Sequence, residues 1–201
     1  MPAHTGPFEV LRAAQRVAVP WKNGGGLTRE VAVEPAGSDL ERFDWRVSIA
    51  EIHAPGPFSR FPGIERRMAA LAGMLTVSIA GQPPVCLSPA TPPLAFPGEV
   101  AACGEPIGGN VTDLNVMTRR ERFTSSLARA NVTQSGRFEA SAPVTLLLAL
   151  TQLELRCGAD AVGLAPLDAV RIAPATRCVI AAGGDAAYYL VAISACPRPG
   201  G

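Results

Sequence analysis

Glycine and proline interrupt short alternating segments along the whole chain, and this feature constrains the fold most. They supply 20 and 19 of the 201 residues. Between the interruptions, apolar and polar residues alternate with the period of two that β-strands show, whereas the helical period of 3.6 is scarce. Short strands at intervals of about ten residues are typical of β-sandwiches and jelly-roll barrels. The sequence therefore predicts an all-β fold.

The expected strands form two series, which are separated by a segment of different composition. Residues 123–143 are polar and irregular, which fits either a crossover segment or a hairpin between two halves. We therefore divide the chain into an N-terminal barrel over residues 1–122 and a C-terminal barrel over 123–201 that includes this crossover. Helix is allowed only at Leu11–Ala18 and Glu65–Leu71. The expected strands are Leu27–Glu34, Trp45–Glu51, Leu75–Ile79, Val85–Leu87, Val111–Thr118, Val144–Leu150, Leu153–Cys157, Ala169–Ile172, Cys178–Ala182 and Tyr188–Ser194.

Charge and hydropathy exclude two classes of partner. The 18 basic and 17 acidic side chains nearly cancel, and no basic cluster of the kind that binds nucleic acid is present. Charged residues such as Glu9 and Arg12 interrupt the N-terminal region, so no signal peptide is expected there. The longest apolar runs are too short or too interrupted to span a bilayer. We expect a soluble, cytoplasmic protein that binds neither nucleic acid nor membrane.

Metal and cofactor chemistry is not expected. The five cysteines are odd in number, widely spaced and without a Cys-x-x-Cys pair, which argues against a zinc site and a disulfide scaffold. The two histidines, His4 and His53, are not paired as metal ligands would be. A Ser-His-Asp triad would need one of them, and no Gly-x-Ser-x-Gly elbow accompanies it. No cofactor, metal ligand or catalytic residue is assigned.

A run of three glycines, Gly24–Gly26, is the most unusual local feature. Bare backbone of this kind permits positive φ and the close approach of another group. The dinucleotide-binding fingerprint would need a further glycine at Arg29, and the phosphate-binding loop would need a Gly-Lys-Ser/Thr end. Both motifs also precede a helix, whereas a strand is expected here. The alternative to a nucleotide-binding motif is that Gly24–Gly26 form a flexible turn that leads into the strand.

Three expected strands each carry two polar residues on one alternating face. These pairs are Thr28 with Glu30, Arg46 with Ser48, and Asp113 with Asn115. If the strands are neighbours, the pairs merge into one polar pocket of both charge signs. The alternative is a solvent-facing polar stripe, which is normal in antiparallel sheets.

A proline-stiffened loop, Gly56–Gly63, precedes two arginines. Arg66 or Arg67 could project from it toward a ligand, although a solvated surface arginine is the commoner case. An arginine in a pocket offers paired donors to a carboxylate. We predict that Arg46, Ser48, Asn115 and Arg66 converge on one cavity of the N-terminal barrel.

Four ordered blocks within residues 20–120 resemble the signature of the HutD/Ves family. The C-terminal half is compatible with the family but carries no motif of comparable specificity. The blocks are Trp21-Lys22-Asn23-Gly24-Gly25-Gly26-x-Thr28-x-Glu30, Phe43-x-Trp45-Arg46-x-Ser48-x-Ala50, Gly56-Pro57-Phe58-Ser59-x-Phe61-Pro62-Gly63-x-x-Arg66 and Asp113-x-Asn115-x-Met117-x-Arg119-Arg120.

This resemblance implies a bicupin, with two RmlC-like double-stranded β-helix barrels that often pair into a homodimer. It also implies a link to histidine utilisation, in which the protein binds a pathway intermediate such as formylglutamate or urocanate in a regulatory role. No established catalytic activity comes with the family. Arg46 and Arg66 would hold the carboxylate of such a ligand, and Trp45 could shape the wall or lie in the core. The full set of expected ligand-binding residues is Asn23, Thr28, Glu30, Arg46, Ser48, Phe61, Arg66, Asp113 and Asn115.

The sequence is also compatible with two other functions. A metal-free cupin enzyme, an isomerase or hydrolase of a small carboxylate, would use Glu30 or Asp113 as its base. A strongly raised carboxylate pKa would favour this function. A scaffold for protein interactions would instead have a closed N-terminal barrel filled with apolar side chains.

Overall fold

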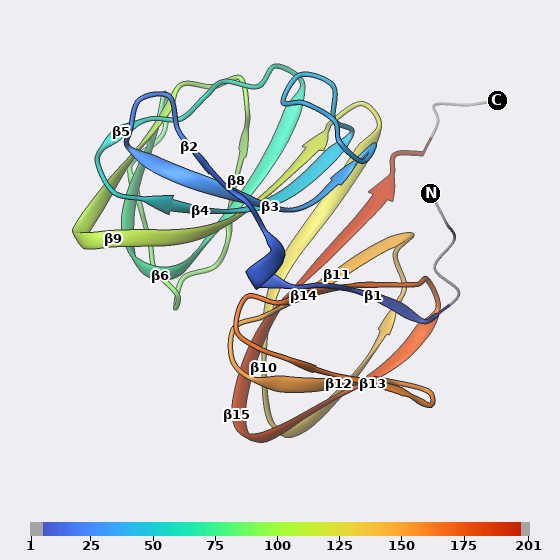
Figure 1. The fold of residues 1–201 in the computed structure, drawn as a ribbon. Coiled ribbons are helices and arrows are strands. Elements are labelled where there is room, and N and C mark those ends of the chain that lie inside the picture. The colour runs from blue at the N-terminus through green and yellow to red at the C-terminus, as the bar shows by residue number, and fades with distance from the viewer. Residues whose placement is uncertain (1–5, 198–201) are drawn as a thin grey trace. The chain divides into compact units, whose positions relative to one another are not determined.

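The computed structural model describes residues 6–197, which are almost entirely β-strands (Figure 1). In this range the only helical element is η1, a 3-10 turn over Ala13–Gln15. The strands are β1 (Phe8–Leu11), β2 (Ala18–Pro20), β3 (Gly26–Glu34), β4 (Trp45–Ile52), β5 (Gly56–Pro57), β6 (Ile64–Ile79), β7 (Val85–Leu87), β8 (Leu94–Pro97), β9 (Ala102–Arg119), β10 (Phe123–Ala140), β11 (Val144–Ala149), β12 (Leu153–Cys157), β13 (Asp160–Leu164), β14 (Ala169–Ile172) and β15 (Thr176–Ala195). The predicted all-β class is confirmed.

Two antiparallel sheets build the two units of the chain. The N-terminal unit holds an eight-stranded sheet in the order β2-β3-β4-β9-β6-β7, to which β5 adds beside β9 and β8 beside β6. The C-terminal unit holds a seven-stranded sheet in the order β1-β14-β11-β15-β12-β13, with β10 beside β15. Non-sequential neighbours such as β4 and β9 are the crossovers that jelly-roll topology requires.

The units exchange their ends, which corrects the expected boundaries at 1–122 and 123–201. Within the described range, residues 16–124 and 195–197 cluster as one unit, and residues 6–15 and 125–194 as the other. At one end, β1 pairs with β14 through Phe8 opposite Ile172. At the other end, the Cys196 amide donates a hydrogen bond to the Arg122 carbonyl. Backbone pairing with distant partners, rather than proximity in sequence, decides where the end segments belong.

Two local assignments also change. Glu65–Leu71 is not a helix but lies inside β6, where Arg66 pairs with both Met117 and Phe96. Its Glu, Arg, Ala and Leu residues favour helix locally, but pairing on both sides overrides that preference. Most of the expected irregular crossover 123–143 is the long strand β10. Likewise, one continuous strand, β15, replaces the two expected near the C-terminus.

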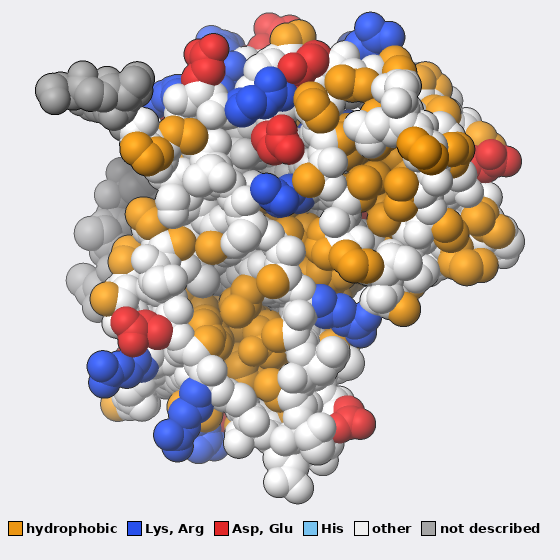
Figure 2. All heavy atoms as spheres, turned by 180° about the vertical axis from the view of Figure 1, so that it is seen from behind, with side chains coloured by type: hydrophobic (Ala, Val, Ile, Leu, Met, Phe, Trp, Pro, Cys, Tyr) orange, Lys and Arg blue, Asp and Glu red, His pale blue; other side chains and the backbone are white. Residues whose placement is uncertain are grey.

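Each unit has its own apolar core. In the N-terminal unit the core includes Met68, Leu75, Phe96 and Val111, all buried. In the C-terminal unit a separate cluster includes Leu147, Leu155, Ile180 and Tyr188, with partly buried apolar side chains packed around it. Figure 2 shows hydrophobic side chains at the bottom of a hollow in the C-terminal unit. The described interior of the C-terminal unit contains no buried lysine or arginine, whereas that of the N-terminal unit does.

A buried carboxylate anchors the N-terminal segment to the C-terminal unit. Asp168 is 4% exposed and accepts hydrogen bonds from the Arg12 guanidinium at 2.8 Å, the Ala13 amide at 2.8 Å and the Ala165 amide at 3.1 Å. Burial alone would raise the pKa of Asp168, but these hydrogen bonds outweigh it and the pKa lies below its ordinary value. The ionised form is therefore the one that the fold stabilises.

Asp168→Asn is expected to lower the free energy of unfolding by about 1–2 kcal/mol at neutral pH, because charge-assisted hydrogen bonds become neutral ones. Since the folded pKa is depressed, the stabilisation is complete above the ordinary aspartate pKa and is lost as the pH falls through the folded value. Urea denaturation at pH 7 and pH 3 measures both effects. The exposed Asp160 provides a matched control, Asp160→Asn. Equal losses in the two variants at pH 7 would contradict the anchoring role.

Candidate functional site

Strand register places the expected polar residues on one face of the N-terminal sheet. Ser48 on β4 lies opposite Glu30 on β3 and Asn115 on β9. Arg46 and Arg66 both lie opposite Met117. Directly opposite residues of antiparallel strands project from the same face. The same face carries Met68 and Ala70, which belong to the apolar core, so it points into the unit.

Arg66 is the only buried lysine or arginine among residues 6–197, with an exposed fraction of 4%. Its guanidinium carbon lies 5.2 Å from the ring centre of Phe58, 6.0 Å from that of Phe61 and 5.0 Å from that of Phe96. Such rings stabilise a cation through their electron-rich faces. Burial lowers the pKa of Arg66 to about 10, against the opposing effect of Asp113. The side chain therefore remains a cation at neutral pH.

The three rings are fixed by the backbone around them. Phe96 lies directly opposite Arg66 on β8. The Phe61 amide donates to the Gly98 carbonyl at 2.8 Å, which holds the proline-stiffened loop against the chain directly after β8. Phe58 packs where Gly104 has no side chain, since a Cβ there would lie 2.7 Å from the ring. Phe58 and Phe61 of the loop and Phe96 of β8 thus form an aromatic cage around the guanidinium.

Asp113 is the second buried charge on this face and is 1% exposed. Burial raises its pKa to about 7, although Arg66 and the backbone of Ala50 both lower it. Its pKa therefore lies well above the ordinary aspartate value. No ion pair within 4.0 Å joins Asp113 to Arg66 in the described residues, so the two charges interact without direct contact.

Three buried polar atoms on this face have no hydrogen-bond partner among the described residues. They are the Arg66 Nε, the Asp113 Oδ1 and the Asn115 Oδ1. Buried polar atoms are nearly always paired, because an unpaired one costs about 1–3 kcal/mol. Nε–H is a donor and the amide oxygen is an acceptor, so a group that offers both an acceptor and a donor would satisfy them.

Arg46 is already paired in this structure. Its Nε donates to Glu30 at 2.9 Å and its Nη1 to the Ser48 hydroxyl at 3.3 Å. Glu30 is 41% exposed at its side chain, so this pair lies toward the solvent side of the face. Arg46 is thus less available to a ligand than Arg66.

The other expected residues occupy different positions. Thr28 accepts a hydrogen bond from the Trp21 indole at 2.8 Å. The Asn23 side chain is exposed and accepts from the Gly25 amide at 3.0 Å, which closes the turn before β3. Trp45 lies opposite Thr118, on the other face from Arg46, and is fully buried. Of the alternatives left open for Trp45, a position in the core is the observed one.

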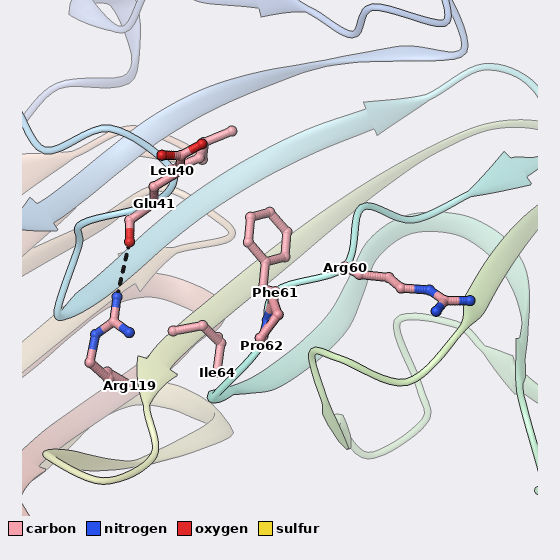
Figure 3. A pocket seen from close by; sticks show the side chains of 7 residues that line it. All are labelled: Leu40, Glu41, Arg60, Phe61, Pro62, Ile64 and Arg119. Atoms are coloured by element: carbon pink, nitrogen blue, oxygen red, sulfur yellow. Dashed lines mark hydrogen bonds between the residues drawn. The ribbon is translucent and has the colours of Figure 1, made fainter.

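An open cavity of about 410 Å³ adjoins the aromatic cage, and Phe61 belongs to both (Figure 3). Arg119 closes one end by donating to the carbonyls of Glu41 at 3.2 Å and Phe43 at 3.1 Å. The Arg60 side chain extends away from the other lining residues in Figure 3. Apart from Phe61, the lining residues were not predicted as site residues: Leu40, Glu41, Arg60, Pro62, Ile64 and Arg119.

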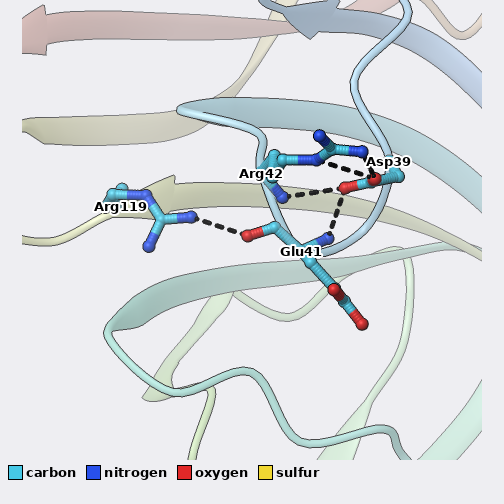
Figure 4. Close-up of polar contacts among 4 residues, drawn as sticks. All are labelled: Asp39, Glu41, Arg42 and Arg119. Atoms are coloured by element: carbon cyan, nitrogen blue, oxygen red, sulfur yellow. Dashed lines mark hydrogen bonds and ion pairs between the residues drawn. The ribbon is translucent and has the colours of Figure 1, made fainter.

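A local hydrogen-bond network holds the loop that forms the far wall (Figure 4). Asp39 accepts from the Glu41 and Arg42 amides at 3.1 and 3.0 Å and from the Arg42 guanidinium at 2.7 Å. The Arg42 side chain therefore lowers the pKa of Asp39, with further help from the Glu41 amide. Arg119 was visible in the fourth sequence block, but nothing in the sequence placed it against this loop.

No cluster of three or more His, Cys, Asp or Glu side chains suited to a metal ion occurs within residues 6–197. His53 directly follows β4, and its Nε2 atom lies 3.5 Å from the Glu51 Oε2 atom. No helix in this range is long and apolar enough to cross a bilayer.

Comparison with known proteins identifies the family. A model of the HutD family matches residues 13–189. The chain belongs to the HutD family. An uncharacterized 21.2 kDa protein in the hutC 3′ region of Pseudomonas putida is 36% identical over 71% of this chain and 73% of that protein. Protein Ves of Citrobacter koseri is 34% identical over 56% of this chain and 59% of its own length. The HutD/Ves resemblance of the four blocks is confirmed.

Solved structures support the bicupin architecture of this HutD family member. PA5104 of Pseudomonas aeruginosa PAO1, a conserved protein of unknown function, has a TM-score of 0.86 and 26% identity, and the match covers 94% of this chain and all of that one. HutD of Pseudomonas fluorescens SBW25 has a TM-score of 0.79 and 28% identity with the same coverage. A cupin 2 barrel protein of Leptotrichia buccalis, 8% identical with a TM-score of 0.60 over 84% of this chain and 89% of that one, shares the fold alone. The predicted bicupin jelly-roll fold is confirmed.

Proposed function

We propose that the N-terminal unit binds a small carboxylate metabolite at Arg66, without a metal ion and in a regulatory role. The observation that carries this proposal is a caged, buried guanidinium whose Nε–H has no partner among the described residues. A carboxylate would accept from it and gain a charge-assisted hydrogen bond in a site of low polarity. Asn115 and Asp113 would contact a polar group on the rest of the ligand.

Family membership narrows the class of metabolite. The Pseudomonas putida relative lies in the hutC 3′ region, which links the family to histidine utilisation. We therefore propose a histidine-degradation intermediate such as formylglutamate or urocanate. Both carry a carboxylate, which would accept from the unpaired Arg66 Nε–H. Both also carry an N–H donor, which would pair with the unpaired Oδ1 atom of Asp113 or Asn115. The HutD structure from Pseudomonas fluorescens was obtained in a formate condition, and formate is the smallest carboxylate probe of the same kind.

The cavity beside the cage offers a route to Arg66. Phe61 lines the cavity on one side and contacts the guanidinium on the other. A rotation of its ring would expose Arg66 to the cavity without a change in the strands. The interaction between the rings and the cation would persist through Phe58 and Phe96.

A thermal-shift screen followed by calorimetry tests this function. Formylglutamate, urocanate and formate are compared with the uncharged amide of each. A ligand at 100 times its dissociation constant stabilises the native state by about 2.7 kcal/mol. The proposal requires stabilisation by at least one carboxylate and none by its amide. Equal stabilisation by both members of every pair, or by neither, would reject it.

Binding should also depend on the protonation of Asp113. A neutral Asp113 leaves Arg66 free for the ligand, whereas an ionised one repels the carboxylate and competes for the cation. Since its pKa is about 7, affinity should be highest below pH 7 and fall up to about tenfold for each pH unit above it. Calorimetry from pH 6 to 8.5 measures this slope, and Asp113→Asn should flatten it. Glu30 and Arg46, two further charged groups on this face, pair with each other and provide a control in Glu30→Gln.

The raised pKa of Asp113 also favours a second candidate function. A carboxyl group poised near neutrality can give or take a proton, as an isomerase or hydrolase of a small carboxylate requires. Asp113 suits this role better than Glu30, which is exposed and paired with Arg46. Incubation of the purified protein with each ligand, followed by proton NMR, distinguishes turnover from binding. Product that forms with the wild type and not with Asp113→Asn would establish the enzyme.

A further inference from the structure

The C-terminal unit contains two buried thiols in direct contact. The Sγ atoms of Cys157 on β12 and Cys178 on β15 lie 3.0 Å apart. These strands are paired, with Arg156 opposite Val179, so the two cysteines are the next opposed pair along the ladder. A disulfide bond is about 2.05 Å long. The sulfurs are therefore about 1 Å from bonding distance, and the backbone already places them face to face.

We infer that Cys157 and Cys178 form a dithiol–disulfide pair that a hydroperoxide oxidises. One thiol reduces the peroxide by two electrons and becomes a sulfenic acid, with release of water or an alcohol. The second sulfur then attacks the sulfenic sulfur, forms the S–S bond and displaces hydroxide, which takes the thiol proton and leaves as water. The sulfurs lose one electron each in the overall reaction.

The surroundings of the pair explain both its protection and its reactivity. Both side chains are buried among the apolar core residues of the unit. Burial raises the pKa of both thiols, so they remain protonated and oxidise slowly. Yet Cys157 directly precedes an exposed turn at Gly158, and Cys178 lies near the start of β15. Strand ends open locally far more often than the whole unit unfolds, and a small uncharged peroxide can then reach the sulfur.

The other cysteines do not share this geometry. Cys86 and Cys103 are exposed, and Cys196 is partly buried with its thiol directed to the Arg120 carbonyl. No sulfur contact joins any of them to another cysteine in the described structure. They can therefore be replaced without disturbing the pair, and in the wild type they report the reactivity of unpaired thiols.

Hydrogen peroxide titration of the variant Cys86→Ser/Cys103→Ser/Cys196→Ser tests the inference. Mass spectrometry should show the loss of two hydrogens, with one cross-linked peptide that contains both remaining cysteines and is reversed by dithiothreitol. The cross-link closes a loop between residues 21 positions apart, so the oxidised form should melt about 5–10 °C higher than the reduced form. Further replacement by Cys178→Ser should abolish both the cross-link and the shift.

Two results would contradict the inference that Cys157 and Cys178 form a dithiol–disulfide pair. One is progression of Cys157 to sulfinic acid with no cross-linked peptide, which would show that the second sulfur cannot reach the first. The other is a cross-link that lowers the melting temperature, which would show that the bond strains the ladder. Oxidation should also proceed more slowly than that of Cys86 in the wild type. These outcomes do not depend on ligand binding in the N-terminal unit.

Discussion

Arg66→Ala is expected to weaken carboxylate binding by about 10- to 150-fold, which corresponds to about 1.5–3 kcal/mol. The substitution removes the only buried cation of the described chain and with it the charge-assisted hydrogen bonds to the ligand. Isothermal titration with the ligand found by screening measures the change. Arg66→Lys should recover part of the affinity, because the charge stays while the planar paired donors are lost.

Arg60→Ala is the matched control for this experiment. Arg60 is exposed on the neighbouring loop, and its loss changes the net charge by the same amount. The fold should survive Arg66→Ala near pH 6, because Asp113 is then largely protonated and no buried charge is left alone. Unchanged affinity in Arg66→Ala with a clear loss in Arg60→Ala would move the ligand into the open cavity. Unchanged affinity in both variants would show that neither Arg66 nor Arg60 binds the carboxylate of the ligand.

Gly26→Ala is expected to destabilise the N-terminal unit by about 3 kcal/mol or more. A Cβ at this position would lie 2.3 Å from the Glu51 carbonyl oxygen and 3.2 Å from the Trp21 ring. The oxygen belongs to the backbone of the adjacent strand, since Gly26 pairs with Ile52. The added atom can be accommodated only if β3 and β4 separate, which strains their hydrogen bonds. Urea denaturation followed by tryptophan fluorescence measures the loss.

The adjacent glycines give a graded comparison. Gly25→Ala should be nearly neutral, because its Cβ would meet only the Asn23 side chain at 3.4 Å. Gly24 has a φ of +69° in open space, so Gly24→Ala should cost about 1 kcal/mol through backbone strain alone. A similar loss at all three positions would mean that backbone flexibility, rather than close approach, explains the glycine run.

The strand pattern was readable from the sequence because alternation is a local property. The strands Val85–Leu87, Leu153–Cys157 and Ala169–Ile172 have the predicted bounds. The period of two also placed Arg46 and Ser48 on one face, and in the structure Ser48 lies opposite Asn115 and Arg46 opposite Met117. Whether that face bound solvent or lined a pocket depended on which strands are neighbours, and a single sequence does not determine that.

The properties that distinguish Arg66 from Arg67 arise only in three dimensions. The two residues are adjacent, and each is an arginine after the same loop. In the fold, Arg66 lies opposite Phe96, its guanidinium lies over the Phe58 ring, and it interacts with Asp113. The raised pKa of Asp113 likewise results from burial, which its neighbours in sequence do not reveal. The exchange of terminal segments escaped prediction for the same reason.

The pairing of β1 with β14 has a consequence for biosynthesis. Arg12 and its partner Asp168 are 156 residues apart in sequence. At ribosomal rates of about 5–20 residues per second, β1 waits roughly 8–30 s for the strand that covers it. Residues 16–124 emerge complete in the meantime, so the unit that carries Arg66 can fold before the unit that contains β1. During synthesis, the nascent chain would thus contain a folded N-terminal barrel while β1 is still unpaired. A fragment that starts at residue 125 would lack β1 altogether.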